Sequence, residues 1–245
     1  MPIEKARGFM LGSIILNDQD KIVSILTKDS GIIKAVAPGA LKKNNRFGAM
    51  LELFTEANIF YYTKEGKELV TLSKGDILKS YFDVVSDPLR IFYFFFMDEL
   101  IEKFLPAEFR AKRIYKLLSS VLKSSESGID PKKLLLYFIV WFLKIEGLMF
   151  NPRLCYNCSS GELREAWIKD DFSGILCGRC RVNEKIYLRN QDLDFLEWIE
   201  KNPPEKLEEW SDNLIFDRLL IVFKNKAEFH GEIKLRSARY LKEFA

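Results

Sequence analysis

Histidine is almost absent from this chain, in which His230 is the only one among 245 residues. His230 stands beside Gly231 at a predicted helix end, so Ser/His and Cys/His catalytic arrangements find no support. The chain also lacks the motifs G-x-x-x-x-G-K-[ST] and G-x-G-x-x-G, which cradle phosphates in nucleotide-hydrolysing and dinucleotide-binding proteins. These absences predict that the protein is not an enzyme.

Long hydrophobic runs are missing as well. No apolar stretch reaches the roughly 18 to 20 residues that cross a bilayer, because charged residues interrupt the most apolar segments. The N-terminus lacks the basic region, the apolar region and the small-residue cleavage site that make up a secretory signal. We therefore expect a cytoplasmic protein without a membrane partner. Cysteine is scarce too, with 4 residues. Because thiols stay reduced in the cytoplasm, we expect these cysteines to bind a metal ion or to be reactive groups rather than to form disulfides.

The overall composition is that of an ordinary globular protein. Apolar residues make up 48% and charged residues 30% of the chain, which excludes a disordered or fibrous chain. The net charge is +3, a weak indication of polyanion binding. The charge is unevenly distributed, because residues 191–217 are mainly acidic and residues 218–245 mainly basic. Two unlike surfaces are therefore expected.

The first 80 residues predict a small β-barrel. β-Branched and aromatic residues form short runs that are separated by turn residues. Short spacers predict antiparallel neighbours, and five strands in about 80 residues favour an OB-type barrel over an open sheet, with other small barrels left open. The five predicted strands are Phe9–Leu16, Lys21–Thr27, Ile32–Ala37, Leu51–Tyr62 and Glu68–Leu72.

After Tyr81 the hydrophobic period becomes helical. Asp87-Pro88 and Asp130-Pro131 each supply an N-cap followed by proline at the first helical position. The first of these starts precedes apolar residues at helical spacing, Leu89, Phe92, Tyr93, Phe96 and Leu100. Further helices are expected at 109–122, 192–201 and 211–230, the last ending at Gly231 as its C′ residue. The fold class is therefore α+β, a barrel followed by an α-helical domain.

Four cysteines form the most specific motif. Cys155 and Cys158, then Cys177 and Cys180, give two C-x2-C turns separated by 18 residues, a spacing typical of a four-thiolate zinc site. Four thiolates close the coordination shell, so we predict one structural Zn²⁺ and no catalytic metal. A metal-free site and a redox pair are the alternatives. Three arginines near in sequence, Arg153, Arg179 and Arg181, would offset the thiolate charge.

A basic loop follows the third predicted strand. From Lys34 to Gly48 the chain carries cations and no acidic residue, and its glycines allow a nucleic-acid strand to approach closely. We predict DNA contact here, with phosphates bound by the cations and a base stacked on the aromatic ring; a merely solvated loop is the alternative. The predicted DNA-binding residues are Lys34, Lys42, Lys43, Arg46 and Phe47.

Taken together, four segments resemble the bacterial RecO family of recombination mediators. The segments are Asp20–Gly31, Val36–Gly48, Glu146–Cys158 and Gly231–Leu241, which are similar in order and spacing to the second strand and turn, basic loop, approach to the cysteines and closing element of that family. The resemblance covers nearly the whole chain. It implies an N-terminal OB fold, a helical domain and a zinc module.

The resemblance also implies a function in DNA repair. Members of the family bind single- and double-stranded DNA, anneal complementary strands coated with the single-strand-binding protein SSB, and act with RecR in loading RecA, without ATP. An acidic SSB tail that ends in phenylalanine would need an apolar pocket with a basic rim. The aromatic run Phe92–Phe96 could supply the pocket, and Lys234, Arg236 and Arg239 are the predicted partner-binding residues.

The domain organisation expected from these features has four segments. They are 1–80 as the OB-fold DNA-binding domain, 81–150 as the first part of the helical domain, 151–186 as the zinc-binding module, and 187–245 as the second part of the helical domain. The competing hypothesis is a zinc-containing adaptor that binds only proteins, with an incidental basic loop.

Overall fold

The computed structural model describes residues 3–64, 66, 68–88, 90–104 and 108–241. Three residues of the predicted turns and helices, Glu65, Lys67 and Leu89, lie outside the described residues. The chain divides into two compact units, Met1–Leu122 and Lys123–Ala245. Each unit is described by itself.

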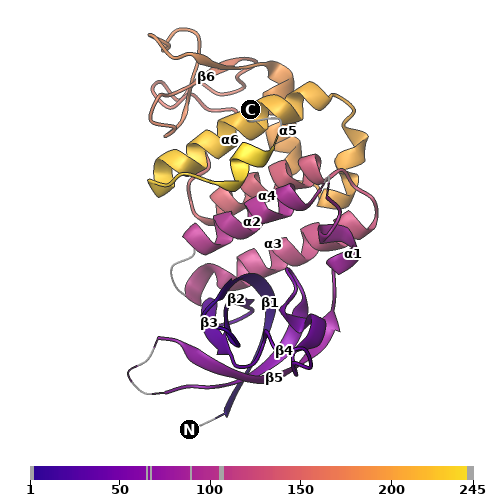
Figure 1. Cartoon of the computed structure of the whole chain (residues 1–245). Helices are drawn as coiled ribbons and strands as arrows, with labels where there is room; N and C mark the ends of the chain where they lie inside the picture. Colours follow the sequence, from indigo (N-terminus) through magenta and orange to yellow (C-terminus); the bar gives the residue numbers. More distant parts are fainter. Residues whose placement is uncertain (1–2, 65, 67, 89, 105–107, 242–245) are drawn as a thin grey trace. The chain divides into compact units, whose positions relative to one another are not determined.

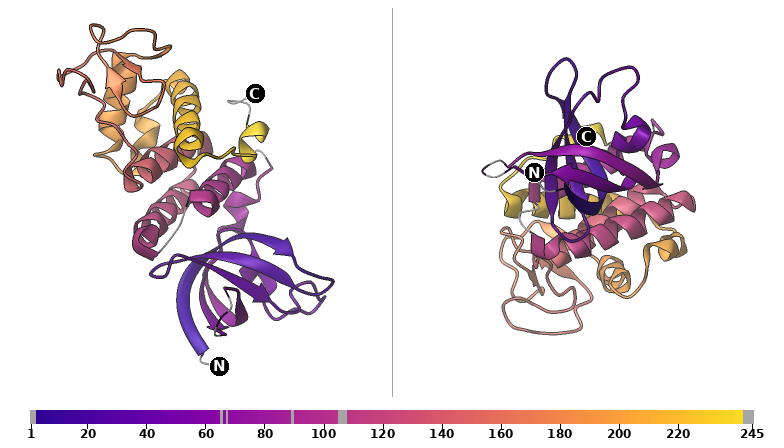
Figure 2. Two further views of the ribbon diagram at one scale, coloured as in Figure 1. Left: turned by 90° about the vertical axis from the view of Figure 1, so that its left-hand side faces the viewer. Right: turned by 90° about the horizontal axis from the view of Figure 1, so that it is seen from below.

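Five strands of the first unit form a closed barrel, which appears in indigo and purple in Figure 1 and from two further sides in Figure 2. Neighbouring strands are antiparallel except for β3 and β5, and the order around the barrel is β1-β2-β3-β5-β4. The predicted OB-type barrel is confirmed. The strands are β1 (Ile3–Ile15), β2 (Lys21–Thr27), β3 (Ile32–Ala37), β4 (Glu56–Tyr62) and β5 (Val70–Lys79).

The barrel interior is filled by alternate residues of the strands, as the two-residue period of a β-strand requires. Ile25, Ile59 and Leu72 are each fully buried in it. The predicted strand Leu51–Tyr62 is wrong in its first half. Residues Gly48–Leu51 form a 3₁₀ turn, Phe54 has a left-handed φ of 57°, and β4 begins only at Glu56. Met50, in this 3₁₀ turn, is buried as part of the barrel core.

Helices complete the first unit. They are α1 (Phe82–Val85), α2 (Ile91–Phe104) and α3 (Glu108–Glu126), which extends beyond Leu122. The start signal Asp87-Pro88 precedes α2, which begins at Ile91. Within the aromatic run, Phe94 and Phe96 are fully buried in the core, Phe92 and Tyr93 are partly buried, and Phe95 is 40% exposed.

The second unit combines helices with a small sheet. Its helices are α4 (Pro131–Ile145), α5 (Asn190–Ile199) and α6 (Asn213–Gly231), with 3₁₀ turns at Pro204–Glu209 and Ser237–Tyr240. Asp130 caps α4 as predicted, because its side chain accepts the Lys132 backbone N–H at 2.8 Å. Gly231 is not the C′ residue: it ends α6, and Glu232 adopts the left-handed conformation that closes the helix.

The cysteine segment forms a three-stranded sheet in the order β7-β6-β8. Strands β6 (Ala166–Ile168) and β7 (Ile175–Leu176) lie between the two cysteine pairs. The third strand, β8 (Ile186–Leu188), follows the second cysteine pair and was not predicted. In the described part of the chain, every helix is too short or too polar to cross a membrane.

Candidate DNA-contact loop and metal centre

The basic loop is anchored on the turn between β1 and β2. The Gly39 backbone N–H donates to the Asp20 carboxylate at 2.7 Å, and the Leu41 N–H donates to the Gln19 carbonyl at 2.9 Å. The Gly39 hydrogen bond is the main reason that the pKa of Asp20 lies below its usual value, followed by the one from Asn17. The carboxylate is therefore fully charged at neutral pH and holds the loop in place.

Residues of the basic loop and of the β1–β2 turn together line a hollow of about 390 Å³. Lys42 and Arg46 line it and are exposed, and Asn44 and Asn45, which stand between them in the sequence, line it as well. Asn45 also braces the loop, since its side-chain oxygen accepts the backbone N–H groups of Phe47 at 3.0 Å and Gly48 at 2.8 Å. Two cations thus face one hollow on a braced loop.

The remaining predicted loop residues lie in different places. Lys43 is exposed in the loop, whereas Lys34 is exposed on β3 opposite Ser24 of β2. Phe47 is only 4% exposed and packs in the barrel core. A buried ring offers no face to a base, so the prediction that Phe47 stacks on a base is wrong. Arg46 lies over its ring, with 5.0 Å between the guanidinium carbon and the ring centroid.

The four cysteines converge in the second unit. Their sulfur atoms all lie within 4.8 Å of one another, and Cys158 and Cys177 have sulfurs 3.8 Å apart. A tetrahedral ion with Zn–S bonds of about 2.3 Å separates its sulfur ligands by about 3.8 Å. Each C-x2-C segment is a tight turn, closed by Ser159 N–H to Cys155 carbonyl at 2.9 Å and Cys180 N–H to Cys177 carbonyl at 3.0 Å. The donor set and its spacing fit a closed metal site.

Backbone N–H groups point at these sulfurs. The Cys177 N–H donates to the Cys155 sulfur at 3.4 Å. Burial works to raise the pKa of the Cys155 thiol, but backbone N–H donation from Cys158, Cys177 and Asn157 outweighs it and lowers the pKa to about 6. A thiolate is the form that binds a metal ion, and backbone N–H donation favours that form at Cys155. Hydrogen bonding with Cys158, and next burial, instead raise the pKa of Cys180 to about 12.

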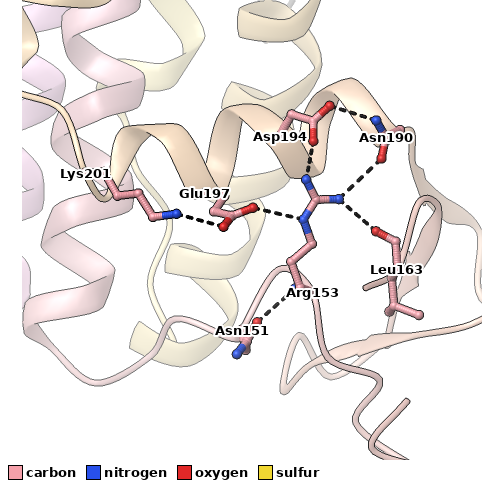
Figure 3. A network of polar contacts seen from close by, with 7 residues as sticks. All are labelled: Asn151, Arg153, Leu163, Asn190, Asp194, Glu197 and Lys201. Carbon is pink, nitrogen blue, oxygen red and sulfur yellow. Dashed lines mark hydrogen bonds and ion pairs between the residues drawn. The ribbon is translucent and has the colours of Figure 1, made fainter. Parts of the chain in front are cut away.

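Arg153 does not neutralise the cysteines but joins their segment to helix α5 (Figure 3). Its guanidinium donates to Glu197 at 3.2 Å, to the Leu163 carbonyl at 2.8 Å and to Asp194. Burial alone would lower the pKa of Arg153, yet the hydrogen bonds to these two carboxylates leave it raised above its usual value. The predicted charge-offsetting role of Arg153 is therefore wrong.

A buried lysine fastens the other side of the cysteine segment. Lys226 of α6 is 1% exposed and donates to the Phe172 carbonyl, in the turn between β6 and β7. Its ammonium lies 5.2 Å from the Phe150 ring centroid and 3.4 Å from the imidazole Nε2 of His230. Burial lowers the pKa of Lys226 to about 8. His230, in the last turn of α6, thus faces another cation.

Next to this turn is a cavity of about 510 Å³ at the end of α6. One predicted partner residue, Lys234, lines it and is 90% exposed, with its ammonium 3.8 Å from the Glu228 carboxylate. Arg236 and Arg239 are exposed in the closing segment. The aromatic run Phe92–Phe96 belongs to the other unit. The other lining residues are Phe172, Asn225, Glu228, Phe229, Glu232 and Ile233.

Two buried carboxylates in the first unit were not predicted. Asp98 of α2 is 8% exposed and accepts the Gly12 N–H of β1 at 3.2 Å. Burial, and next the charge of Glu102, raise the pKa of Asp98 to about 8. Glu56, 6% exposed at the start of β4, accepts from Arg7 at 2.8 Å and from the Tyr115 hydroxyl. A sequence pattern gives no signal for such residues, because acidic side chains are ordinarily exposed.

Comparison with known proteins bears on both sites. The family model described as Recombination protein O N terminal matches residues 1–81, and the one described as Recombination protein O C terminal matches residues 85–220. The curated DNA repair protein RecO of Symbiobacterium thermophilum is 31% identical over 187 residues, covering 74% of this chain and 72% of its own length. The corresponding protein of Halalkalibacterium halodurans is 29% identical, covering 72% and 68%.

An OB-type barrel followed by helices and a four-cysteine cluster defines a non-enzymatic protein of DNA repair and recombination, the class to which both matching models point. The chain belongs to the RecO family of recombination mediators. The predicted family, the α+β fold class and the absence of an enzymatic function are thereby confirmed.

Proposed function

We propose that this protein binds single- and double-stranded DNA, anneals complementary strands and, together with RecR, helps RecA to load onto SSB-coated single strands. Residues 1–80 are the proposed DNA-binding domain. The observation that carries the proposal is the braced basic loop, where Lys42 and Arg46 face one hollow of about 390 Å³ beside the Gly39 backbone. Exposed cations on a held loop can neutralise phosphates with little loss of conformational freedom.

Annealing follows from the same chemistry. Two strands repel each other through their phosphates, and cations that neutralise one strand lower the cost of bringing up the other. Lys34 on β3 and Lys43 in the loop are two further exposed cations of the same unit. Such contacts carry no base information, so one protein can pair any complementary sequences. Neither binding nor release needs a nucleotide cofactor.

We assign one structural Zn²⁺ to Cys155, Cys158, Cys177 and Cys180. When bound, the ion would link two turns that the chain separates by 18 residues, and four thiolates would leave no coordination position for water. The ion would therefore stabilise the sheet β7-β6-β8 rather than react.

The cavity beside Lys234 supports a recruitment role for the second unit. Phe172, Phe229 and Ile233 give it apolar walls, and Lys234 stands at its edge. An SSB tail that ends in phenylalanine and a carboxylate would place its ring against the apolar walls and its acidic groups near the lysine. Arg236 and Arg239 would extend the basic rim along the exposed closing segment.

The triple variant Lys42→Ala, Lys43→Ala, Arg46→Ala tests the loop. Three phosphate contacts contribute about two units to the slope of log affinity against log salt for single strands, so the slope should fall by about two, equally for all DNA sequences. Annealing should slow in parallel. Equilibrium titrations of labelled DNA at several salt concentrations measure both quantities.

The matched control removes three exposed cations of α3 from the same unit: Lys112→Ala, Arg113→Ala, Lys116→Ala. Net charge changes equally in the two triple variants, so this control should retain most of the slope. Equal losses in both variants would show that net charge, and not the loop, binds DNA. An unchanged slope in the loop variant would favour the adaptor hypothesis.

A further inference from the structure

Three residues form a row across the outer surface of the barrel, on three adjacent strands. Lys5 of β1 pairs with Phe60 of β4, and Phe60 pairs with Lys74 of β5. Both ammonium groups approach the Phe60 ring, at 5.5 Å for Lys5 and 5.1 Å for Lys74 from the ring centroid. The ring is partly exposed and is flanked on either side by a cation.

A β-bulge brings the second cation to the ring. Tyr61 pairs with Leu72 inside the barrel, whereas Phe60 pairs with Lys74, so Ser73 is an extra residue in β5. A regular ladder would place Ser73 opposite Phe60. The bulge therefore exchanges a hydroxyl for an ammonium group at this position.

Glycine at position 75 allows β5 to follow this path. A Cβ atom there would lie 2.4 Å from the Met50 sulfur and 2.8 Å from the Asn58 carbonyl oxygen. The strand can come this close to β4 only without a side chain, and the pairing Phe60–Lys74 immediately precedes the close approach. The geometry around the ring is thus built into the backbone.

The row continues along β4 on one side of the strand. Asn58 and Tyr62, two residues before and after Phe60, are partly exposed, whereas Ile59 and Tyr61 point into the core. Phe60 and Tyr62 are therefore about 7 Å apart on one surface. Towards the start of β4 this surface ends at buried Glu56, and Asp76, opposite Asn58, is an acidic neighbour. Its open part carries two aromatic rings and two lysines.

We propose that this surface, the Phe60 platform, binds single-stranded nucleic acid through base stacking. An unpaired base can stack on an aromatic ring whatever its sequence, and lysines on both sides can bind the flanking phosphates. When a base takes the ring face, the two ammonium groups exchange the ring for phosphate oxygens. A duplex keeps its bases stacked inside and offers no face to the ring. The platform is therefore specific for unpaired strands.

This inference rests on the proposed DNA-binding function but uses different strands of the barrel. The basic loop follows β3, whereas the platform is centred on β4, which pairs with β1 and β5. Two contact surfaces on one barrel let the loop hold backbone phosphates while the platform holds bases in their unpaired state. An annealing protein needs bases that are presented and not yet paired.

The variant Phe60→Leu tests the platform, because leucine retains apolar packing but has no aromatic face. Loss of one base stack should weaken binding to single-stranded DNA roughly 5- to 150-fold. The salt slope and the affinity for double-stranded DNA should stay unchanged. The matched control is Phe82→Leu in α1, where the phenylalanine is 47% exposed but lies outside the sheet, and it should bind as the wild type does.

The double variant Lys5→Gln, Lys74→Gln should lower the salt slope for single strands by about 1.4, since each phosphate contact contributes about 0.7. Ultraviolet crosslinking of the wild-type protein to oligo(dT), followed by peptide mass spectrometry, should identify the Phe60 peptide. Normal single-strand affinity of Phe60→Leu, or crosslinks confined to other peptides, would overturn the platform. If the loop triple variant then still lost binding, the proposed function would stand alone.

Discussion

At the scale of single residues, buried and partly buried titratable groups hold the elements of this protein in place. Arg153, Lys226 and Asp98 each join segments that are distant in sequence, through hydrogen bonds to backbone or carboxylate groups. Such groups are costly to bury and remain tolerable because their polar atoms have partners. Of these three, Asp98 has the titration that is simplest to measure.

Asp98→Asn should remove a pH dependence from folding stability. Burial raises the pKa of Asp98 in the folded protein from its usual value of 3.8 to about 8. Between these two pH values the folded protein keeps a proton on Asp98 that the unfolded chain has lost. Stability from this group is therefore present below about pH 4 and is lost as pH rises towards 8. Asparagine still accepts the Gly12 N–H but does not titrate.

We expect Asp98→Asn to be more stable than the wild type at pH 7, by about 1–3 kcal/mol, and the difference to shrink towards pH 4. Urea unfolding of both proteins from pH 4 to 8 measures it. Glu102→Gln, on the same helix, is the control for the neighbouring charge. A stability difference that does not vary with pH would show that Asp98 is ionised in the folded protein.

At the scale of elements, short-range signals predicted most of the fold. Turn residues and β-branched runs located β2 and β3 at their observed bounds, and Asp130-Pro131 located the start of α4. Long-range pairing decided the rest. The extra residue Ser73 in β5, the third strand β8 and the turn at Phe54 depend on contacts between distant segments. No local pattern reports such contacts.

The candidate sites divide in the same way. Cysteine spacing and a run of cations are local: the four cysteine sulfurs converge in the structure, and Lys42 and Arg46 of the predicted DNA-binding residues line one hollow. Burial is not local, which explains why Phe47 was placed in the wrong environment. The Phe60 platform could not be predicted, because its three residues meet only through cross-strand register.

The cysteine element itself makes a clear prediction. Cys177→Ser should release the metal and destabilise the sheet β7-β6-β8, because structural zinc sites supply folding free energy on the order of 10 kcal/mol in peptide models. Elemental analysis of the untagged, reduced wild-type protein should find one zinc per chain. Cys177→Ser should reduce the solubility of the protein more than its DNA affinity, since the basic loop belongs to the other unit.

The matched control for Cys177→Ser is Ser173→Ala, a small exposed change in the turn of the same sheet, which should retain full zinc. Wild-type protein without zinc under reducing conditions would remove the assignment of this ion. Full zinc content in Cys177→Ser would show that three of the cysteines suffice to hold it.

At the scale of the whole molecule, the two units would have different functions. The barrel would bind DNA through the loop and the platform, and the second unit would bind the acidic tail of SSB beside Lys234. Net charge is only +3, so neither activity follows from overall charge. DNA binding and SSB binding both depend on where cations are placed. Because the two sets of cations lie in different units, variants of one unit can test each activity separately.

The most direct measurement of the central claim is the annealing rate of complementary single strands coated with SSB, without ATP. The account predicts that the wild-type protein accelerates annealing of both bare and SSB-coated strands. With SSB that lacks its terminal phenylalanine, acceleration of coated strands should be lost while that of bare strands remains. No acceleration of bare strands at low salt would contradict the account.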